Sequence, residues 1–353
     1  MKKRDPLAEE LAQIAAARAS PSSEASQMLF VKVLDGKRSY AIAAVAELVA
    51  SERLVALVPK LVAAFARLAT AGGDPGCRAR TAIATALLAL DADEPELFLR
   101  GVTLVQREPV MGGNVDVAVD LRGVCALGLA NLGDPRALPA LVNLLVDPEW
   151  PARQSAARAL GATGRLEAEA VLRHKALVGD AEPQVTGEVF ASLLTMAPRE
   201  SLAFVASFLE RRSPPHGAIH AVRAGGETHG IACTACGQSA TGQLETTTEV
   251  AALALGQSRR PDALPILIAW SERLSWAERR VALLALAMLR STAAIDHLMS
   301  AIEEGPIDAA VHAVNALALH RHDEELVARV RKEVDKRGSK PLKEAFREAF
   351  AQS

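Results

Sequence analysis

The stretch that decides the fold runs from Arg122 to Pro183. It reads RGVCALGLANLGDPRALPALVNLLVDPEW over 122–150 and RQSAARALGATGRLEAEAVLRHKALVGDAEP over 153–183. In both copies a segment rich in Ala and Leu is followed by a glycine, a second apolar segment and an acidic turn. Apolar residues at i, i+3, i+4 and i+7 are typical of a helix with one buried face. Each copy therefore predicts two short helices.

The same pattern recurs along the chain. Related segments open at Gln184, Glu249, Arg279 and Asp308. The starts at 122, 153 and 184 are 31 residues apart, and those at 249, 279 and 308 are 30 and 29 apart. One helix pair cannot bury its apolar face alone, but stacked neighbours can. The sequence predicts an all-α fold, an α-solenoid (superhelix) of stacked antiparallel helix pairs.

Composition supports helices over sheets. Half of the 353 residues are hydrophobic, yet aromatic residues make up only 3% and Tyr40 is the single tyrosine. The apolar residues are therefore mainly Ala, Leu and Val. This composition argues against a β-sandwich or barrel, which rely on aromatic and β-branched side chains. Ala and Leu are strong helix formers.

Charge and cysteine content limit the classes of protein to which the chain can belong. The formal net charge is −2, whereas a dedicated nucleic-acid binder carries a basic field. No run of 18 apolar residues occurs, so we expect no membrane span. The start MKKRDPLAEELAQI is a poor signal peptide, and four cysteines do not form a disulfide framework. We therefore expect a cytoplasmic protein.

One repeat resembles a known family. Leu138 to Asp147, read with Arg153 and the segment from Ala156 to Gly161, resembles a bacterial HEAT-like repeat of the phycobilisome-lyase type. The resemblance is best over 116–180 and 247–320 and weaker over 38–107. It implies an armadillo-like superhelix. HEAT-like arrays serve as scaffolds, lyase subunits and DNA-repair proteins, so the resemblance alone does not assign a role.

The repeat pattern divides the chain into six parts. The two ends are expected to be helical caps, and the middle is expected to hold the repeats. The parts are an N-terminal cap at 1–37, irregular helix pairs at 38–107, repeats at 108–210, an insertion or degenerate repeat at 211–248, repeats at 249–322 and a C-terminal cap at 323–353.

The segment 108–115 (EPVMGGNV) interrupts the helices. Its paired glycines favour a flexible turn. It is interpreted either as an ordinary long loop or as a binding loop, because long loops often carry function. Its candidate polar groups are Glu108, Asn114 and Asp116.

The insertion is rich in Gly, His and Cys. It holds His229, Cys233 and Cys236, and His216 or His220 could complete four ligands for zinc, which prefers thiolate and imidazole. A second C-x-x-C is absent, and so is the βαβ context of a redox pair. We expect a flexible loop and no cofactor, with a zinc site or a redox pair as alternatives.

Acids at the turns and bases early in the next helix suggest a ladder between repeats. In HEAT-like units such groups commonly bond across repeats, and the resemblance implies this role for Asp147 and Arg153, with Arg122 and Arg280 comparable. Such a pair fixes the stacking register. The candidate partner-binding residues are Arg122, Trp150, Arg153, Gln154 and Arg158.

The function predicted is a non-enzymatic scaffold or adaptor. A stack of helix pairs offers an extended concave surface for a protein or peptide partner. The sequence contains no Gly-rich phosphate loop, no H-E-x-x-H and no G-x-S-x-G motif. The alternatives are a lyase-like enzyme subunit and a HEAT-like nucleic-acid-binding protein.

Overall fold

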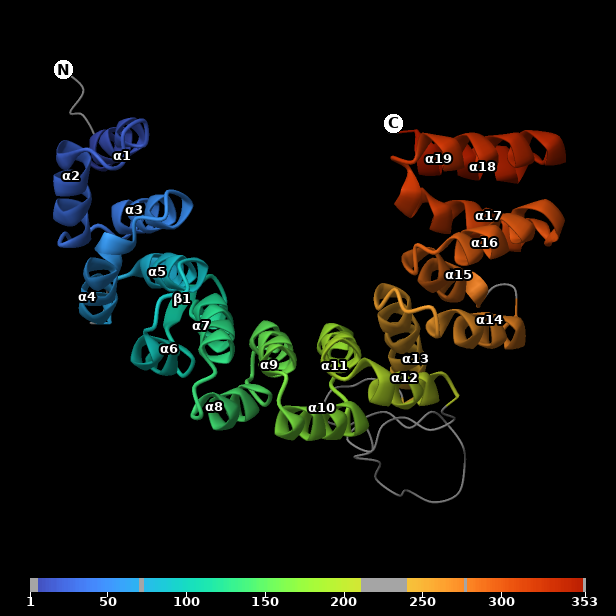
Figure 1. Ribbon diagram of the computed structural model, residues 1–353, viewed down its shortest axis with the longest axis horizontal. Coiled ribbons are helices and arrows are strands. Elements are labelled where there is room, and N and C mark those ends of the chain that lie inside the picture. The colour runs from blue at the N-terminus through green and yellow to red at the C-terminus, as the bar shows by residue number, and fades with distance from the viewer. Residues whose placement is uncertain (1–5, 70–72, 211–239, 276–277, 352–353) are drawn as a thin grey trace. The chain divides into compact units, whose positions relative to one another are not determined.

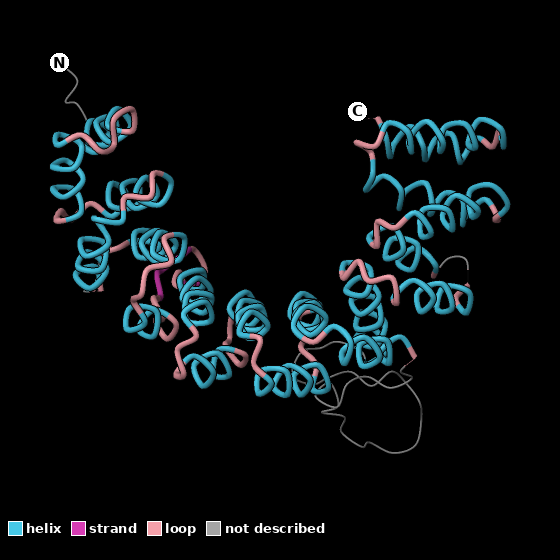
Figure 2. Tube along the Cα trace, viewed as in Figure 1, coloured by secondary structure: helices cyan, strands magenta, loops and turns pink. Residues whose placement is uncertain are grey.

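The chain folds into two compact helical units. The computed structural model describes residues 6–69, 73–210, 240–275 and 278–351. The chain divides after Ala168 into an N-terminal and a C-terminal unit. Nearly all described residues outside the turns are helical, and each unit is a stack of helix pairs (Figures 1 and 2). The predicted all-α solenoid is confirmed.

The N-terminal unit has two layers. The odd-numbered helices α1, α3, α5, α7 and α9 pack against one another in chain order and form what we call the odd layer. The even-numbered helices pack against them from the other side. The elements are α1 (Pro6–Ala17), α2 (Glu24–Leu34), α3 (Ser39–Ser51), η1 (Val55–Leu57), α4 (Val58–Leu68), η2 (Pro75–Cys77), α5 (Arg78–Ala89), α6 (Pro95–Gly101), β1 (Arg107–Val110), β2 (Gly113–Asp116), α7 (Val119–Leu132), α8 (Ala137–Leu144) and α9 (Trp150–Thr163).

The C-terminal unit repeats this arrangement. Helices α11, α13, α15, α17 and α19 stack in order and form the odd layer of this unit, and α12, α14, α16 and α18 cover them. Helix α10 begins just before the division of the chain. The elements are α10 (Leu166–Val178), α11 (Pro183–Met196), α12 (Pro198–Ala206), η3 (Ser207–Leu209), α13 (Ala240–Gln257), α14 (Ala263–Arg273), α15 (Arg279–Met288), α16 (Thr292–Glu304), α17 (Ile307–Leu317), η5 (Ala318–His320), α18 (Glu324–Arg337) and α19 (Lys340–Phe350).

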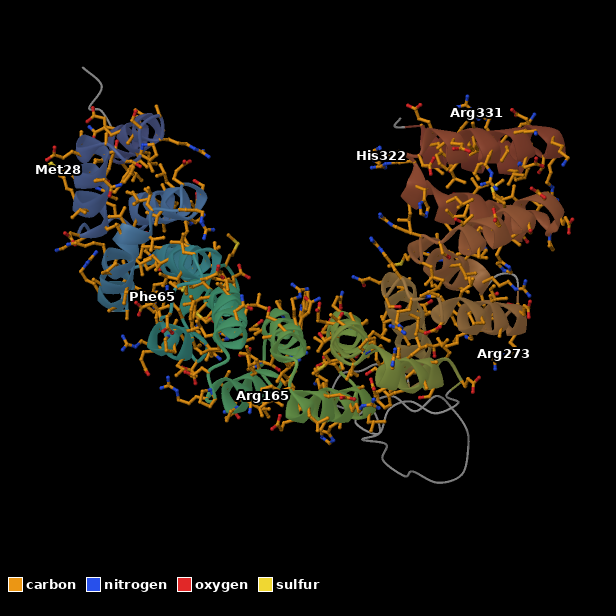
Figure 3. The ribbon with its side chains drawn as sticks, in the orientation of Figure 1. Met28, Phe65, Arg165, Arg273, His322 and Arg331 are labelled. Atoms are coloured by element: carbon orange, nitrogen blue, oxygen red, sulfur yellow. The ribbon has the colours of Figure 1, made fainter. Side chains whose placement is uncertain are left out.

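The core of each unit is a seam of small and aliphatic side chains between layers. In α9, for example, Ala156, Ala157 and Leu160 are fully buried. Phe65 of α4 is buried between helices, whereas Met28 of α2 is exposed (Figure 3). Alanine lets neighbouring helices approach closely, which is why so little aromatic volume is needed.

Two boundaries differ from expectation. The interruption at 108–115 is a β-hairpin, in which Arg107 pairs with Asp116 and Val110 with Gly113. Gly112 at its tip has φ +98°, a conformation that glycine adopts without strain. Residues 240–248, assigned above to the insertion, belong to α13, the helix that stacks between α11 and α15.

Gly256 sits where two helices touch. A Cβ added there would collide with the backbone carbonyl of Ala285 in α15, and a backbone group cannot rotate away. A Cβ at Gly187 of α11 would meet only the side chain of Val250, at an ordinary 3.7 Å. The α13–α15 contact therefore requires glycine, and the α11–α13 contact does not.

We predict that Gly256→Ala lowers the free energy of unfolding by about 1–3 kcal/mol, because overpacking outweighs the better helix propensity of alanine. The matched variant Gly187→Ala should be neutral or up to about 1 kcal/mol more stable. Urea denaturation measures both. Equal effects in the two variants would contradict the contact.

Candidate functional site

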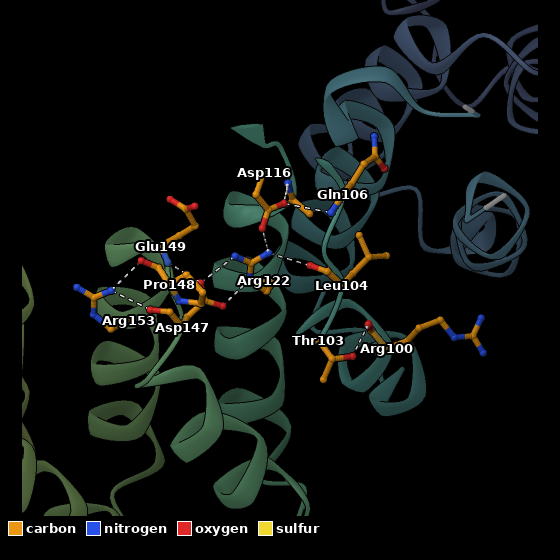
Figure 4. Close-up of polar contacts among 11 residues, drawn as sticks. Arg100, Thr103, Leu104, Gln106, Asp116, Arg122, Asp147, Pro148, Glu149 and Arg153 are labelled. Atoms are coloured by element: carbon orange, nitrogen blue, oxygen red, sulfur yellow. Dashed lines mark hydrogen bonds and ion pairs between the residues drawn. The ribbon is translucent and has the colours of Figure 1, made fainter. Parts of the chain in front are cut away.

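A buried ion-pair ladder joins consecutive repeats of the N-terminal unit (Figure 4). The Arg122 side chain, 2% exposed, lies between two carboxylates. Its Nη1 is 2.6 Å from Asp116 Oδ2, and its Nη2 donates to Asp147 Oδ1 at 3.0 Å. Nη1 also donates to the carbonyl of Leu104 at 2.9 Å. The guanidinium of α7 thus ties the turn before α7 to the turn before α9.

The same motif occurs one repeat earlier. Asp74 and Arg80 are six residues apart, as are Asp116 and Arg122, and their side chains pair at 3.2 Å while almost fully buried. Asp74 also accepts the N–H groups of Ala79 and Arg80 at the start of α5. The carboxylate therefore both caps a helix and holds the arginine.

The sequence predicts Asp147, Arg153 and Arg280 as ladder residues, and the structure gives each of them a different set of contacts. The carboxylate of Asp147 accepts the side chain of Arg122 and the N–H of Glu149. Arg153, six residues after Asp147, donates to the backbone carbonyls of Asp147 and Pro148. Arg280 is exposed, and the part of the chain that the structure describes offers it no ion pair.

The carboxyl of Asp116 is held in its charged form. Burial raises its pKa, but hydrogen bonds from the N–H of Ala118, from Arg122 and from the N–H of Gln106 lower it by more. The pKa of Asp116 therefore lies below its ordinary value. A depressed carboxyl pKa stabilises the folded state above the ordinary value, and this stability is lost as pH falls through the folded-state pKa.

The hairpin β1–β2 is anchored on this ladder. Glu108 accepts the N–H of Gly76 at 2.8 Å and the side-chain N–H of Gln106 at 2.7 Å. Glu108 and Asp116 thus hold the hairpin to the body of the unit, while Asn114 is exposed. The tip is apolar, because Met111 is fully exposed and Val110 is half exposed. The sequence interpretation of this segment as a binding loop rests on polar groups alone, whereas the structure exposes apolar side chains at its tip.

A groove crosses three successive helices of the odd layer. It measures about 400 Å³ and lies where α3, α5 and α7 meet. The lining residues are Glu47, Ala50, Gly76, Arg78, Thr81, Ala82, Thr85, Ala86 and Asp120. Beside it, the guanidinium of Arg78 lies over the exposed ring of Tyr40, 4.9 Å from its centroid. We call this the α3–α5–α7 groove.

This groove is not among the sites expected from the sequence, although the sequence contains a signal for it. Thr81 and Thr85 stand one turn apart in an otherwise Ala-rich helix, and each hydroxyl donates to the carbonyl four residues earlier. Polar residues at this spacing mark the exposed face of the helix. Glu47 of α3 and Asp120 of α7 line the same groove only because the three helices stack. The sequence of one helix alone does not show this.

The predicted partner-binding residues are distributed between core and surface. Arg122 is buried and its guanidinium is bonded within the ladder, so it does not contribute to an exposed binding surface. On α9, Trp150 is 37% exposed, Arg158 is exposed, and Arg153 and Gln154 are half buried.

A second cavity of about 400 Å³ lies in the C-terminal unit, between α14, α15, α16 and α17. His297, Glu272 and Arg279 contribute its charged or titratable groups. Burial lowers the pKa of His297, Glu272 opposes this effect and Arg279 adds to it, so the imidazole is neutral at pH 7.

The zinc alternative falls on residues that the structure leaves undescribed. His229, Cys233 and Cys236, with His216 and His220, lie within 211–239. Within the described residues, no group of three His, Cys, Asp or Glu could hold a metal ion. The described helices also include none that is long and apolar enough to cross a membrane.

We predict that the free energy of unfolding falls as pH drops below about 4, because Asp116 must be protonated. Asp116→Asn should lose about 1.5–3 kcal/mol at pH 7 and should flatten the acid limb of the curve. Denaturant unfolding between pH 7 and pH 2.5 measures this. Asp120→Asn, which changes an exposed carboxylate in the first turn of α7, is the control. Parallel curves for Asp116→Asn and the wild type would contradict the assignment.

Family models match two stretches of the chain. Residues 116–193 match HEAT repeats, and residues 278–304 match the PBS lyase HEAT-like repeat. The first stretch includes the Asp116–Arg122–Asp147 ladder. A search of curated proteins finds no match.

Similar solved structures share low identity with the chain. The complex of CpcE and CpcF of phycocyanin lyase from Nostoc sp. PCC7120 is 19% identical, with 74% of this chain and 87% of that chain covered and a TM-score of 0.36. Human deoxyhypusine hydroxylase in complex with glycerol is 15% identical, with coverage of 99% and 100% and a TM-score of 0.28. An engineered protein is 17% identical, with coverage of 100% and 97% and a TM-score of 0.38.

The two family matches fall on the ranges whose residues carry the resemblance in the sequence, and both ranges form stacked helix pairs. Residues 116–193 and 278–304 are therefore HEAT-like repeats, the second stretch being of the PBS lyase type.

Proposed function

We propose that the protein is a non-enzymatic HEAT-repeat scaffold that binds a protein or peptide partner on the exposed face of its odd layer. The α3–α5–α7 groove is the observation that carries this proposal. It collects side chains from three consecutive helices. A partner seated there contacts several repeats at once, which is the use that extended repeat surfaces serve.

The chemistry of the groove suits a polypeptide. Its floor is made of Ala50, Ala82 and Ala86, small residues that let a backbone approach closely. Glu47 and Asp120 add negative charge, and Arg78 adds positive charge. Groups of both signs, with hydroxyls between them, match the mixed hydrogen-bonding groups of a peptide.

The Tyr40–Arg78 pair is the proposed anchor. Tyrosine and arginine are enriched among residues that dominate binding energy, because each offers a large rigid surface with a polar group. Stacking at 4.9 Å holds the Arg78 guanidinium in place before a partner arrives. We add Trp150, Arg153, Gln154 and Arg158 of α9 as proposed contacts further along the same layer.

We predict that Thr85→Arg abolishes partner binding, because a long charged side chain fills the groove without touching the core. Affinity purification from cell extract with the native protein as bait measures this, with each captured protein quantified. Thr103→Arg is the control, since Thr103 is likewise exposed and its hydroxyl likewise donates to a carbonyl of its own chain.

Both variants should keep the melting temperature of the wild type, because neither side chain is buried. A partner lost with Thr85→Arg and kept with Thr103→Arg supports the proposal. If Thr85→Arg retains every protein captured by the wild type, the groove is not the binding site.

A lyase-like role is the second candidate, and the match of residues 278–304 to the PBS lyase HEAT-like repeat favours it. Such a role needs a bound chromophore. We expect no change in the absorption spectrum of candidate tetrapyrroles when they are mixed with the purified protein. A shifted and intensified band would favour the lyase-like role over the scaffold.

A further inference from the structure

Three arginines occupy one repeated position in the C-terminal unit. Arg259, Arg290 and Arg321 are spaced 31 residues apart. Arg259 and Arg290 lie in the turns after α13 and α15, and Arg321 follows α17 and the short helix η5 that extends it. Their backbones are anchored alike, because each N–H donates at 3.2 Å to the carbonyl three residues earlier. We call these three residues the arginine row.

The row lies along one edge of the unit. Helices α13, α15 and α17 stack as consecutive neighbours, and each returns through an even-numbered helix, so their C-terminal ends point the same way. The turns after these helices accordingly share one side of the unit (Figure 2), and His322, which follows Arg321 in the sequence, is labelled in Figure 3.

The arginine side chains are available. All three residues are exposed, and within the described part of the chain none of them forms an ion pair. Two acids close in sequence are already engaged. Asp262 pairs with Arg260 at 2.9 Å, and Asp323 accepts the N–H of Leu326.

Two of the three arginines have a backbone conformation that is uncommon for residues other than glycine. Arg259 has φ +52° and Arg290 has φ +55°, the left-handed conformation that favours glycine. At the matching turns of the N-terminal unit, Gly133 and Gly164 follow α7 and α9, whereas Arg53 and Asp91, also with positive φ, follow α3 and α5. Glycine fits the backbones of Arg259 and Arg290 better, so stability does not explain an arginine at either position.

We propose that the arginine row binds an acidic peptide segment of a protein partner in the polyproline II conformation, with a carboxylate at every third residue. Stacked helices lie about 8–10 Å apart, and one three-residue turn of polyproline II helix rises about 9 Å and returns every third side chain to the same face. Consecutive arginines therefore face consecutive carboxylates. Arginine and carboxylate pair through two parallel hydrogen bonds.

A peptide fits the row better than a nucleic acid. Single-stranded nucleic acids bind on aromatic side chains on which bases stack. The three turns, 257–262, 288–292 and 319–323, contain no Phe, Tyr or Trp. The row is also separate from the α3–α5–α7 groove, so this proposal goes beyond the proposed function and is tested without it.

The test uses fluorescence anisotropy with a labelled peptide of four Glu-Ser-Gly triplets, at about 50 mM salt. The full-length wild-type protein should bind it, and binding should weaken strongly at about 500 mM salt. The double variant Arg259→Gly/Arg290→Gly should bind roughly 2- to 30-fold more weakly, the range for two exposed ion pairs of about 0.2–1 kcal/mol each.

The variants are chosen to remain folded. Glycine suits both backbone positions, so the melting temperature of the double variant should equal or exceed that of the wild type. Arg53→Gly is the matched control, because Arg53 follows α3 of the other unit with φ +51°. It and Thr85→Arg should both bind the peptide as the wild type does.

Several results would overturn the proposal. They are no binding by the wild type at low salt, equal loss with Arg53→Gly, equal affinity for a peptide with its four glutamates contiguous, and tighter binding of a single-stranded oligonucleotide at the same salt. Weaker binding by the double variant alone, with the spaced peptide preferred, supports it.

Discussion

Close contact between successive odd-layer helices is the constraint on which everything else in this protein depends. No helix pair can bury its own apolar face, so each needs the next pair, and the contact is tight enough that Gly256 admits no side chain against Ala285. Small residues make this approach possible. They also explain how a chain with 3% aromatic residues builds a continuous core.

Buried ion pairs fix the register in which neighbouring helix pairs pack. Apolar stripes alone tolerate sliding, whereas Arg122 is ion-paired on both sides only when both Asp116 and Asp147 are in place. The pair Asp74–Arg80 acts one repeat earlier. Removing one partner leaves a buried charge, so the ladder penalises a wrong register more than it stabilises the right one. The same carboxylates cap the helices that they join.

The proposed functions use what this framework leaves exposed. In the N-terminal unit, residues from α3, α5 and α7 form a groove of mixed charge with a stacked Tyr40–Arg78 pair beside it. In the C-terminal unit, an edge carries Arg259, Arg290 and Arg321 at the period of the repeat. A periodic scaffold thus converts a repeated position in the sequence into a row of identical groups in space.

The sequence by itself determined the helices, their pairing and the solenoid, because the 31-residue period and the Ala–Leu stripe are local patterns. It also pointed to Asp147 and Arg122 as ladder residues. Only the tertiary structure decided that the carboxylate of Asp147 pairs with Arg122 while Arg153 donates to the backbone carbonyl of Asp147, that residues 107–116 form a hairpin, and that Glu47 and Asp120 share a groove. These outcomes depend on distances between residues far apart in the chain, which are set by how closely neighbouring helices pack.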